Sequence, residues 1–130
     1  MEQYGERDLC QVTGLLNMMQ FMRLASVHLQ DPLAEPLTFL YFDIENFKSF
    51  NQRYGFRHGN RLLRYMADLL REIFEGDLVA RLNDDHFAVA TQSGNAGDCI
   101  QFIHERVRVY DLGLPMEVKA GIYQPPNGLT

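Results

Sequence analysis

The sequence predicts an α/β domain of the α+β type, with a mixed, mainly antiparallel sheet and helices packed on its faces. Apolar runs of strand length alternate with segments of helical periodicity, in the order strand, helix pair, strand, turn, strand, helix, strand. That order is the βαββαβ arrangement of ferredoxin- and palm-like domains. A length of 130 residues suits one domain, and 46% hydrophobic residues are enough for a core. We therefore expect a single domain over residues 1–130, with residues 1–12 as a lead-in segment.

The first half of the chain predicts a helix, a strand and a second, short helix. Apolar residues recur at helical spacing from Leu16 to Leu29, and Asn17 is a suitable cap for the start. Three methionines in this helix suggest either core packing or a pliable binding groove, and we prefer core packing. Leu37–Phe42 is apolar throughout, as expected of a central strand buried on both faces. A short helix should follow Asp43 and break near Gly55.

The second half predicts a long helix, a β-hairpin, another helix and a last strand. The long helix should begin after Gly59 and end at Gly76-Asp77. In the hairpin, Asn83-Asp84 suits the tight turn because both residue types tolerate left-handed backbone conformations. The remaining elements are hairpin strands over Val79–Leu82 and Phe87–Ala90, a helix over about Asp98–Tyr110, a strand over Met116–Tyr123 and a tail over Gln124–Thr130.

Overall charge and the lack of long apolar runs limit the partners that we expect. The formal net charge is −5 and the pI is about 5.3, which argues against nucleic acid, since binding that polyanion needs clustered Lys and Arg. No apolar run approaches the ~20 residues of a membrane helix, and no signal-peptide pattern opens the chain. We expect no membrane contact from this segment and a cytoplasmic location. Cys10 and Cys99 should be free thiols.

Asp43 and the residues of the hairpin turn are the first candidates for chemistry. Asp43 ends the first predicted strand, which in this arrangement lies beside the hairpin, so its side chain can approach Asp85. Two carboxylates there suit Mg²⁺, which takes few protein oxygens and leaves positions for phosphate and water. Asp85 and His86 could equally belong to a solvated turn, and Asp43 could simply cap the next helix. On the residues alone, these alternatives stay open.

Four separated patches of the sequence resemble the GGDEF domains of bacterial diguanylate cyclases. They are similar, in order, to the family motifs Leu-Thr-Gly-Leu-x-Asn, Phe-Asp-Ile-Asp-x-Phe-Lys, Asn-Asp-x-x-Gly-His-x-x-Gly-Asp and Val-Ala-Arg-Leu-Gly-Gly-Asp-Glu-Phe-Ala-Val. The patches are Val12–Asn17, Phe42–Lys48, Asn51–Asn60 and Val79–Val89. Because they lie in order and at matching spacings from about Asp8 to Tyr123, the resemblance predicts the fold of that family.

This resemblance implies a domain that binds Mg²⁺ and GTP and, as one of a facing pair, joins two GTP molecules into cyclic di-GMP. The implied partners are therefore GTP and either a second copy or other domains of the same signalling protein. Phosphoryl transfer of this kind needs mainly metal neutralisation of charge and alignment of attack. The implied residues are Asp43, the Ile44 carbonyl and Asp85 for the metal, the amides near Asn46 and Phe47 for phosphate, and Asn51 and Asn60 for guanine.

The signature itself departs from the family pattern, because Gly-Gly-Asp-Glu-Phe is replaced by Asn-Asp-Asp-His-Phe at residues 83–87. Asn83 and Asp84 would lie beside the nucleotide where glycines leave space, and Asp84 adds a negative charge next to a triphosphate. His86 stands where the family uses a glutamate at the metal or the attacking hydroxyl. Asp85 and His86 are thus the catalytic candidates, although a neutral imidazole cannot supply the missing anionic charge.

Three further differences point away from the usual reaction. Asn60 stands where the family has Asp, which weakens recognition of guanine. Phe74 stands where an inhibitory product site would need Arg. The sequence reaches Thr130 before the family's last, basic helix, so we expect the C-terminal part of the usual domain to be missing.

We therefore expect a degenerate, catalytically inactive GGDEF domain that acts as a regulatory, interaction or GTP-sensing module in cyclic-di-GMP signalling. The alternative is an active, Mg²⁺-dependent diguanylate cyclase that tolerates the altered signature.

Overall fold

The computed structural model describes residues 9–92, 94–110 and 116–125. Its elements follow the predicted βαββαβ order, preceded by one helix. They are α1 (Met18–Gln30), β1 (Thr38–Ile44), α2 (Phe47–Tyr54), α3 (Phe56–Ile73), β2 (Leu78–Asn83), β3 (His86–Thr91), α4 (Ala96–Arg108) and β4 (Val118–Tyr123). Most of the predicted lead-in and the tail from residue 126 lie outside the described residues, and the last strand begins at Val118, two residues later than predicted.

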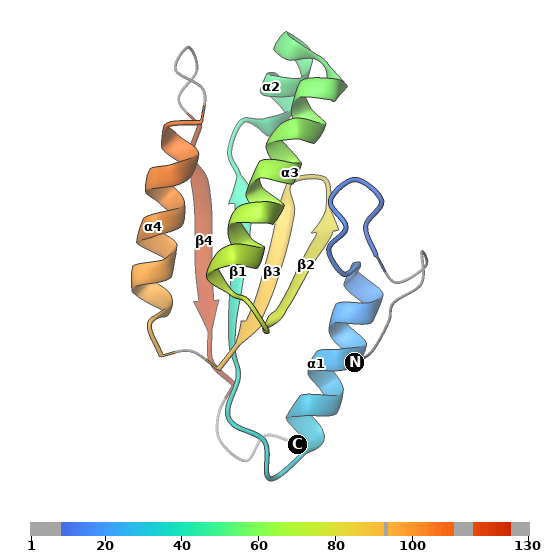
Figure 1. Cartoon of the computed structure of the whole chain (residues 1–130), viewed down its shortest axis with the longest axis vertical. Coiled ribbons are helices and arrows are strands. Elements are labelled where there is room, and N and C mark those ends of the chain that lie inside the picture. Colours follow the sequence, from blue (N-terminus) through green and yellow to red (C-terminus); the bar gives the residue numbers. More distant parts are fainter. Residues whose placement is uncertain (1–8, 93, 111–115, 126–130) are drawn as a thin grey trace.

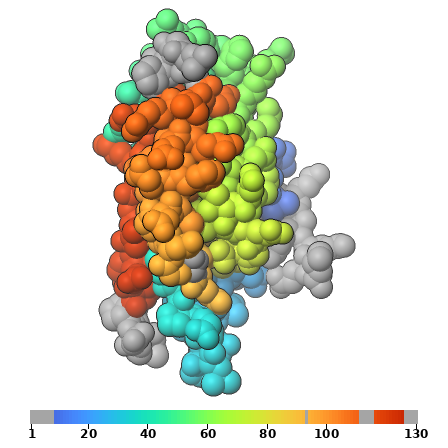
Figure 2. Space-filling view, turned by 60° about the vertical axis from the view of Figure 1, so that its left-hand side comes forward, coloured from blue at the N-terminus to red at the C-terminus, as the bar shows by residue number. Residues whose placement is uncertain are grey.

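The four strands form one sheet in the order β2-β3-β1-β4, and each neighbouring pair is antiparallel. The predicted position of the first strand beside the hairpin is therefore confirmed. Figure 1 shows α3 and α4 crossing one face of this sheet, with α1 beside β2 and with α2 at the same end of the sheet as the β2–β3 turn. In Figure 2, α4 and α3 lie against each other along the molecule.

The larger core lies between the sheet and the helices α3 and α4. Alternate residues of β1 point into it, because successive side chains of a strand face opposite sides. Its buried members include Leu40, Phe42, Ile44, Leu62, Leu63, Met66, Leu70, Ile103 and Val107. The other face of the sheet was expected to be equally buried along β1, and this is wrong at one position: Tyr41 is 44% exposed.

A smaller core joins α1 to the opposite face of the sheet. Phe21 meets Phe39 edge to face, with 6.3 Å between ring centroids, and Ala25 is buried beside them. The predicted cap is confirmed, since the side chain of Asn17 accepts a hydrogen bond from the N–H of Gln20 at 3.0 Å. Among the described residues, no helix combines the length and apolar character needed to cross a bilayer.

The three methionines of α1 do not pack in the core, so that prediction is wrong. Met18, Met19 and Met22 are 45%, 80% and 58% exposed. The face of the sheet that packs against α1 carries small residues such as Ala88, so α1 lies close to the sheet. Phe21 and Ala25 fill the narrow space between them. The methionines therefore lie to the side of the buried stripe.

The helix predicted after Gly59 begins earlier, at Phe56, directly after the break at Gly55. Gly55 has φ +90°, which explains the break between α2 and α3. Gly59 therefore lies inside α3. A Cβ at this position would come within 1.7 Å of Oδ1 of Asn51, so a larger residue here would have to displace the side chain of Asn51.

Truncation of a core residue should cost far more stability than truncation of an exposed methionine. Leu70 of α3 is fully buried, so Leu70→Ala should lower the free energy of unfolding by about 2–5 kcal/mol. Met19→Ala removes an exposed side chain and should change it by no more than about 0.5 kcal/mol. Urea unfolding measures both. Equal losses in the two variants would mean that the methionine belongs to the core.

Candidate metal and nucleotide site

A two-residue turn closes the β2–β3 hairpin, one position later than predicted. Asn83 pairs with His86 across the hairpin, so Asp84 and Asp85 form the turn, and an irregularity lies between Arg81 and Asn83. Asp84 has φ +35°, a conformation that Asp tolerates better than most residues. Nε of Arg81 donates a hydrogen bond to the carbonyl of Asp84 at 2.8 Å. The sequence thus keeps a tight turn without glycine.

The pairing of β1 with β3 brings the end of β1 to this turn. Asp43 lies opposite His86 in the register, and the N–H of Ile44 donates to the carbonyl of Asp85 at 3.2 Å. The strand runs one residue beyond Asp43, to Ile44, whose side chain is buried in the core. The buried side chain of Ile44 therefore takes no part in the site, and the metal-binding role predicted for its backbone carbonyl stays a prediction. The expected approach of Asp43 to Asp85 is confirmed as geometry.

Asp43, Asp85 and His86 form a cluster of potential metal ligands, with one ligand atom from each lying within 4.8 Å of the others. Nε2 of His86 lies 3.6 Å from Oδ2 of Asp43, and Nδ1 lies 3.7 Å from Oδ1 of Asp85. The side chain of Asp85 is only 17% exposed, whereas those of Asp43 and His86 are 43% and 49% exposed. The cluster therefore has one enclosed carboxylate and one side open to solvent.

The enclosed carboxylate is hard to ionise beside its neighbour. Burial, followed by the hydrogen bond and the negative charge of Asp43, raises the pKa of Asp85 to about 6 from an ordinary value of 3.8. The charge of His86 acts in the opposite direction. A cation bound next to Asp85 would favour its ionised form.

The start of α2 offers backbone amides next to this cluster. Asn46 precedes the helix in a left-handed conformation, with φ 61°, and its side chain makes no capping hydrogen bond. The first amides of the helix, including that of Phe47, therefore have no side-chain cap at this position. Free amides and the positive end of the helix dipole suit a phosphate group. The phosphate-binding role predicted for the amides near Asn46 and Phe47 stays a prediction.

The predicted guanine contacts lie at the junction of α2 and α3, at the same end of the sheet (Figure 1). Oδ1 of Asn51 is buried and has no hydrogen-bond partner in the described structure, which is unusual for a buried acceptor. The close approach of Gly59 encloses this oxygen, so a base would have to meet Asn51 through its amide nitrogen. Asn60 follows Gly59 on α3 and is half-buried.

A comparison with known families decides the identity of the fold. The sequence profile described as "Diguanylate cyclase, GGDEF domain" matches residues 8–123. This chain belongs to the GGDEF family.

Two curated relatives carry opposite names. The chain is 39% identical over 77 residues to the probable diguanylate cyclase DgcF of Escherichia coli (strain K12), covering 58% of this chain and 24% of DgcF. It is 30% identical over 81 residues to the cyclic di-GMP phosphodiesterase NbdA of Pseudomonas aeruginosa, covering 60% of this chain and 10% of NbdA. The chain thus spans less than a quarter of the length of these relatives.

A solved structure shows the same fold. The coiled coil and GGDEF domain of DgcB from Caulobacter crescentus, in complex with c-di-GMP, matches with a TM-score of 0.82 over 96% of this chain and 73% of that one. The sequence identity is 18%, so this likeness concerns the fold alone.

Sequence reasoning did not single out Lys119, which lies next to the potential metal ligands of this GGDEF domain. Lys119 lies opposite Asp43 on β4, and its ammonium is 3.3 Å from a carboxylate oxygen of Glu45. With Asp43, His86 and Tyr41 it lines an open hollow of about 200 Å³. No motif marks this lysine, because only the β1–β4 register brings it to the site.

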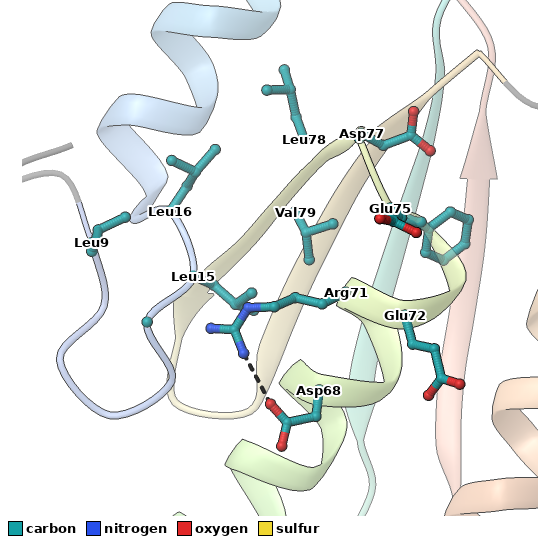
Figure 3. Close-up of a pocket in the computed structure, with 13 residues that line it drawn as sticks. Leu9, Leu15, Leu16, Asp68, Arg71, Glu72, Glu75, Asp77, Leu78 and Val79 are labelled. Atoms are coloured by element: carbon teal, nitrogen blue, oxygen red, sulfur yellow. Dashed lines mark hydrogen bonds and ion pairs between the residues drawn. The ribbon is translucent and has the colours of Figure 1, made fainter. Parts of the chain in front are cut away.

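A second, larger cleft of this GGDEF domain lies at the C-terminal end of α3 (Figure 3). It has a volume of about 640 Å³, and leucines from the segment before α1 form one wall. Arg71 donates one hydrogen bond to the carboxylate of Asp68 on its own helix and another to the carbonyl of Thr13, in the segment before α1. The other charged side chains that line it are Glu72, Glu75 and Asp77, all acidic.

The absence of an inhibitory nucleotide site at Phe74 stays a prediction, and the structure gives the surroundings of this residue. Phe74 is 2% exposed and belongs to the core instead of offering a cation. Asp77 accepts a hydrogen bond from the hydroxyl of Thr91 at 2.7 Å. The surrounding carboxylates would repel an anionic ligand.

Asp85 should make the domain less stable at neutral pH than in mild acid. Because folding raises its pKa from 3.8 to about 6, the folded state keeps a proton that the unfolded chain has already released. The stability contributed by this proton is complete below about pH 4 and is lost as the pH rises through about 6. One pKa unit corresponds to about 1.4 kcal/mol, and solvent screening reduces it, so we expect a loss of roughly 1–2 kcal/mol.

Urea unfolding between about pH 4 and pH 7 measures this loss. Asp85→Asn should reduce the pH dependence by the contribution of this residue, whereas the neighbouring Asp84→Asn serves as a matched control and should keep the wild-type dependence. A slope in Asp85→Asn equal to that of the wild type would contradict the assignment.

Proposed function

We propose that this GGDEF domain binds GTP together with a divalent cation, does not convert it to cyclic di-GMP, and regulates neighbouring domains of a cyclic-di-GMP signalling protein. The observation that carries the proposal is the turn at residues 83–86. It keeps a carboxylate at Asp85 but has side chains at Asn83 and Asp84 where the family has glycines.

The binding half of the proposal rests on groups that remain in place. Asp43 and Asp85 would hold the cation, and a bound cation would neutralise charge on the phosphates. The amides at the start of α2 would receive a phosphate group, and Asn51 and Asn60 would contact the guanine. Two carboxylates with open positions fit a divalent ion, and the enclosed Asp85 gains most from one.

The loss of catalysis rests on charge and space. Asp84 places a further carboxylate beside the position of a triphosphate, where like charges at ~4 Å cost about 1 kcal/mol in water and several times more in a partly buried site. His86 brings no negative charge to the metal or to an attacking hydroxyl. Since phosphoryl transfer depends on alignment, a displacement of the nucleotide by about 1 Å, caused by Asn83 and Asp84, would slow it by about a hundredfold.

A regulatory role agrees with the relatives that the chain resembles. One is named for cyclic di-GMP synthesis and another for its hydrolysis, and both are much longer than this chain. A GGDEF domain thus accompanies either activity, and a domain that only binds GTP can act on an attached domain or on a second copy of itself.

The second candidate is an active diguanylate cyclase. The surviving pair of Asp43 and Asp85 favours it, because this pair would hold the metal ion, and the positive charge of that ion is what the reaction depends on most.

Binding and product formation can be measured separately on the full-length protein that contains this domain. We expect GTP with Mg²⁺ or Mn²⁺ to raise the unfolding temperature in a saturable way, since a ligand that binds only the folded state stabilises it. Asp85→Asn should remove this shift, and Asp98→Asn, an exposed carboxylate on α4, should not. Chromatography of the same mixtures should detect no cyclic di-GMP.

Two results would contradict the proposal in different ways. Cyclic di-GMP formation that is lost in Asp85→Asn would establish the active cyclase. Absence of any shift with GTP would remove nucleotide binding from the account.

A further inference from the structure

The three potential metal ligands Asp43, Asp85 and His86 include a nitrogen donor, and Mg²⁺ is a poor match for nitrogen. Mg²⁺ prefers an octahedral shell of oxygens and retains several waters. Imidazole nitrogen instead suits transition-metal ions such as Zn²⁺, whose sites combine His nitrogen with Asp oxygen. The donor set of Asp43, Asp85 and His86 therefore fits a divalent ion in charge but not Mg²⁺ in ligand type.

We propose that Asp43, Asp85 and His86 bind a nitrogen-accepting transition-metal ion of the Zn²⁺ class in preference to Mg²⁺. This inference rests on the proposed function only in that both assign a cation to the same site.

The spacing of the donor atoms supports a small tetrahedral shell. Zn²⁺ binds nitrogen and oxygen at about 2.0–2.2 Å, which places neighbouring ligands about 3.3–3.6 Å apart. One nitrogen of His86 and one oxygen from each carboxylate all lie within 4.8 Å of one another, and Nε2 of His86 is 3.6 Å from Oδ2 of Asp43. Small side-chain adjustments at these partly exposed residues are enough to close the shell.

The position of the imidazole between two carboxylates also favours a defined ligand orientation. Nε2 faces Asp43 while Nδ1 faces Asp85. When one nitrogen binds metal, the N–H of the other can be held by the second oxygen of the carboxylate that it faces, so that this carboxylate both binds the ion and orients the ring.

The summed charge of the three ligands and the exposure of Asp43 and His86 also suit a divalent ion. Two carboxylates and a neutral imidazole balance a divalent ion. Three protein ligands leave one tetrahedral position, and the half-exposed side of Asp43 and His86 leaves it accessible to water or phosphate. His86 comes from the first position of β3, and Asp43 from the paired position of β1, so backbone hydrogen bonds hold the two ligands together.

The test uses metal ions alone, without nucleotide. Zn²⁺ should stabilise the full-length protein at concentrations where Mg²⁺ has no effect, and Co²⁺ as a spectroscopic substitute should give the visible absorption of a tetrahedral site without thiolate bands. His86→Glu should weaken Zn²⁺ binding by at least about tenfold, the loss that even outer-shell changes produce, and should make the protein respond to Mg²⁺. The matched control His58→Gln changes an exposed histidine of α3 and should leave Zn²⁺ binding unchanged.

Three results would overturn the proposal. The first is an equal stabilisation by Zn²⁺ and Mg²⁺, and the second is Zn²⁺ binding that is unchanged in His86→Glu. The third is no metal binding at all, which would mean that the imidazole itself offsets the negative charge of the two carboxylates. Each of these differs from a failure of the proposed function, which is read from GTP binding in Mg²⁺. Zn²⁺ selectivity without GTP binding would retain this inference and remove the proposed function.

Discussion

The antiparallel register of β1 with β3 is the constraint on which the rest of the site depends. It sets Asp43 opposite His86 and lets the amide of Ile44 bond to the carbonyl of Asp85. A shift by one residue would turn Asp43 to the other face of the sheet and bury it in the core that Phe42 now fills. The buried face of β1 therefore fixes the register, and the register fixes the cluster.

Much of this arrangement could be predicted from the sequence, because it follows from topology. Strand order places the end of β1 beside the hairpin, and alternation along β1 identifies Asp43 as facing away from Phe42. What could not be predicted depends on three-dimensional contacts. The exposure of Met19 follows from how closely α1 approaches the sheet, and Gly59 lies inside α3, against Asn51, because the break comes at Gly55. Lys119 reaches the site only through pairing with β4.

The β2–β3 hairpin forms although Asn83 and Asp84 replace the two glycines of the family signature. A two-residue turn needs left-handed conformations, and Asp84 adopts one while Arg81 binds its carbonyl. The hairpin is thus kept without glycine, whereas the space and charge next to it are changed. Under the proposed function, this GGDEF domain keeps its sheet, its cores and its carboxylate pair, while its role changes from phosphoryl transfer to nucleotide binding.

The most direct test of this account is the affinity for GTP when the turn is returned to glycine. In the double variant Asn83→Gly/Asp84→Gly, the carboxylate pair and the register are untouched, and removal of one nearby negative charge should strengthen GTP binding by about tenfold. Calorimetric titration of the wild-type and variant proteins with GTP at equal Mg²⁺ measures the ratio. Tighter binding in the variant is the predicted result, and unchanged or weaker binding would contradict the claim that Asn83 and Asp84 crowd the nucleotide.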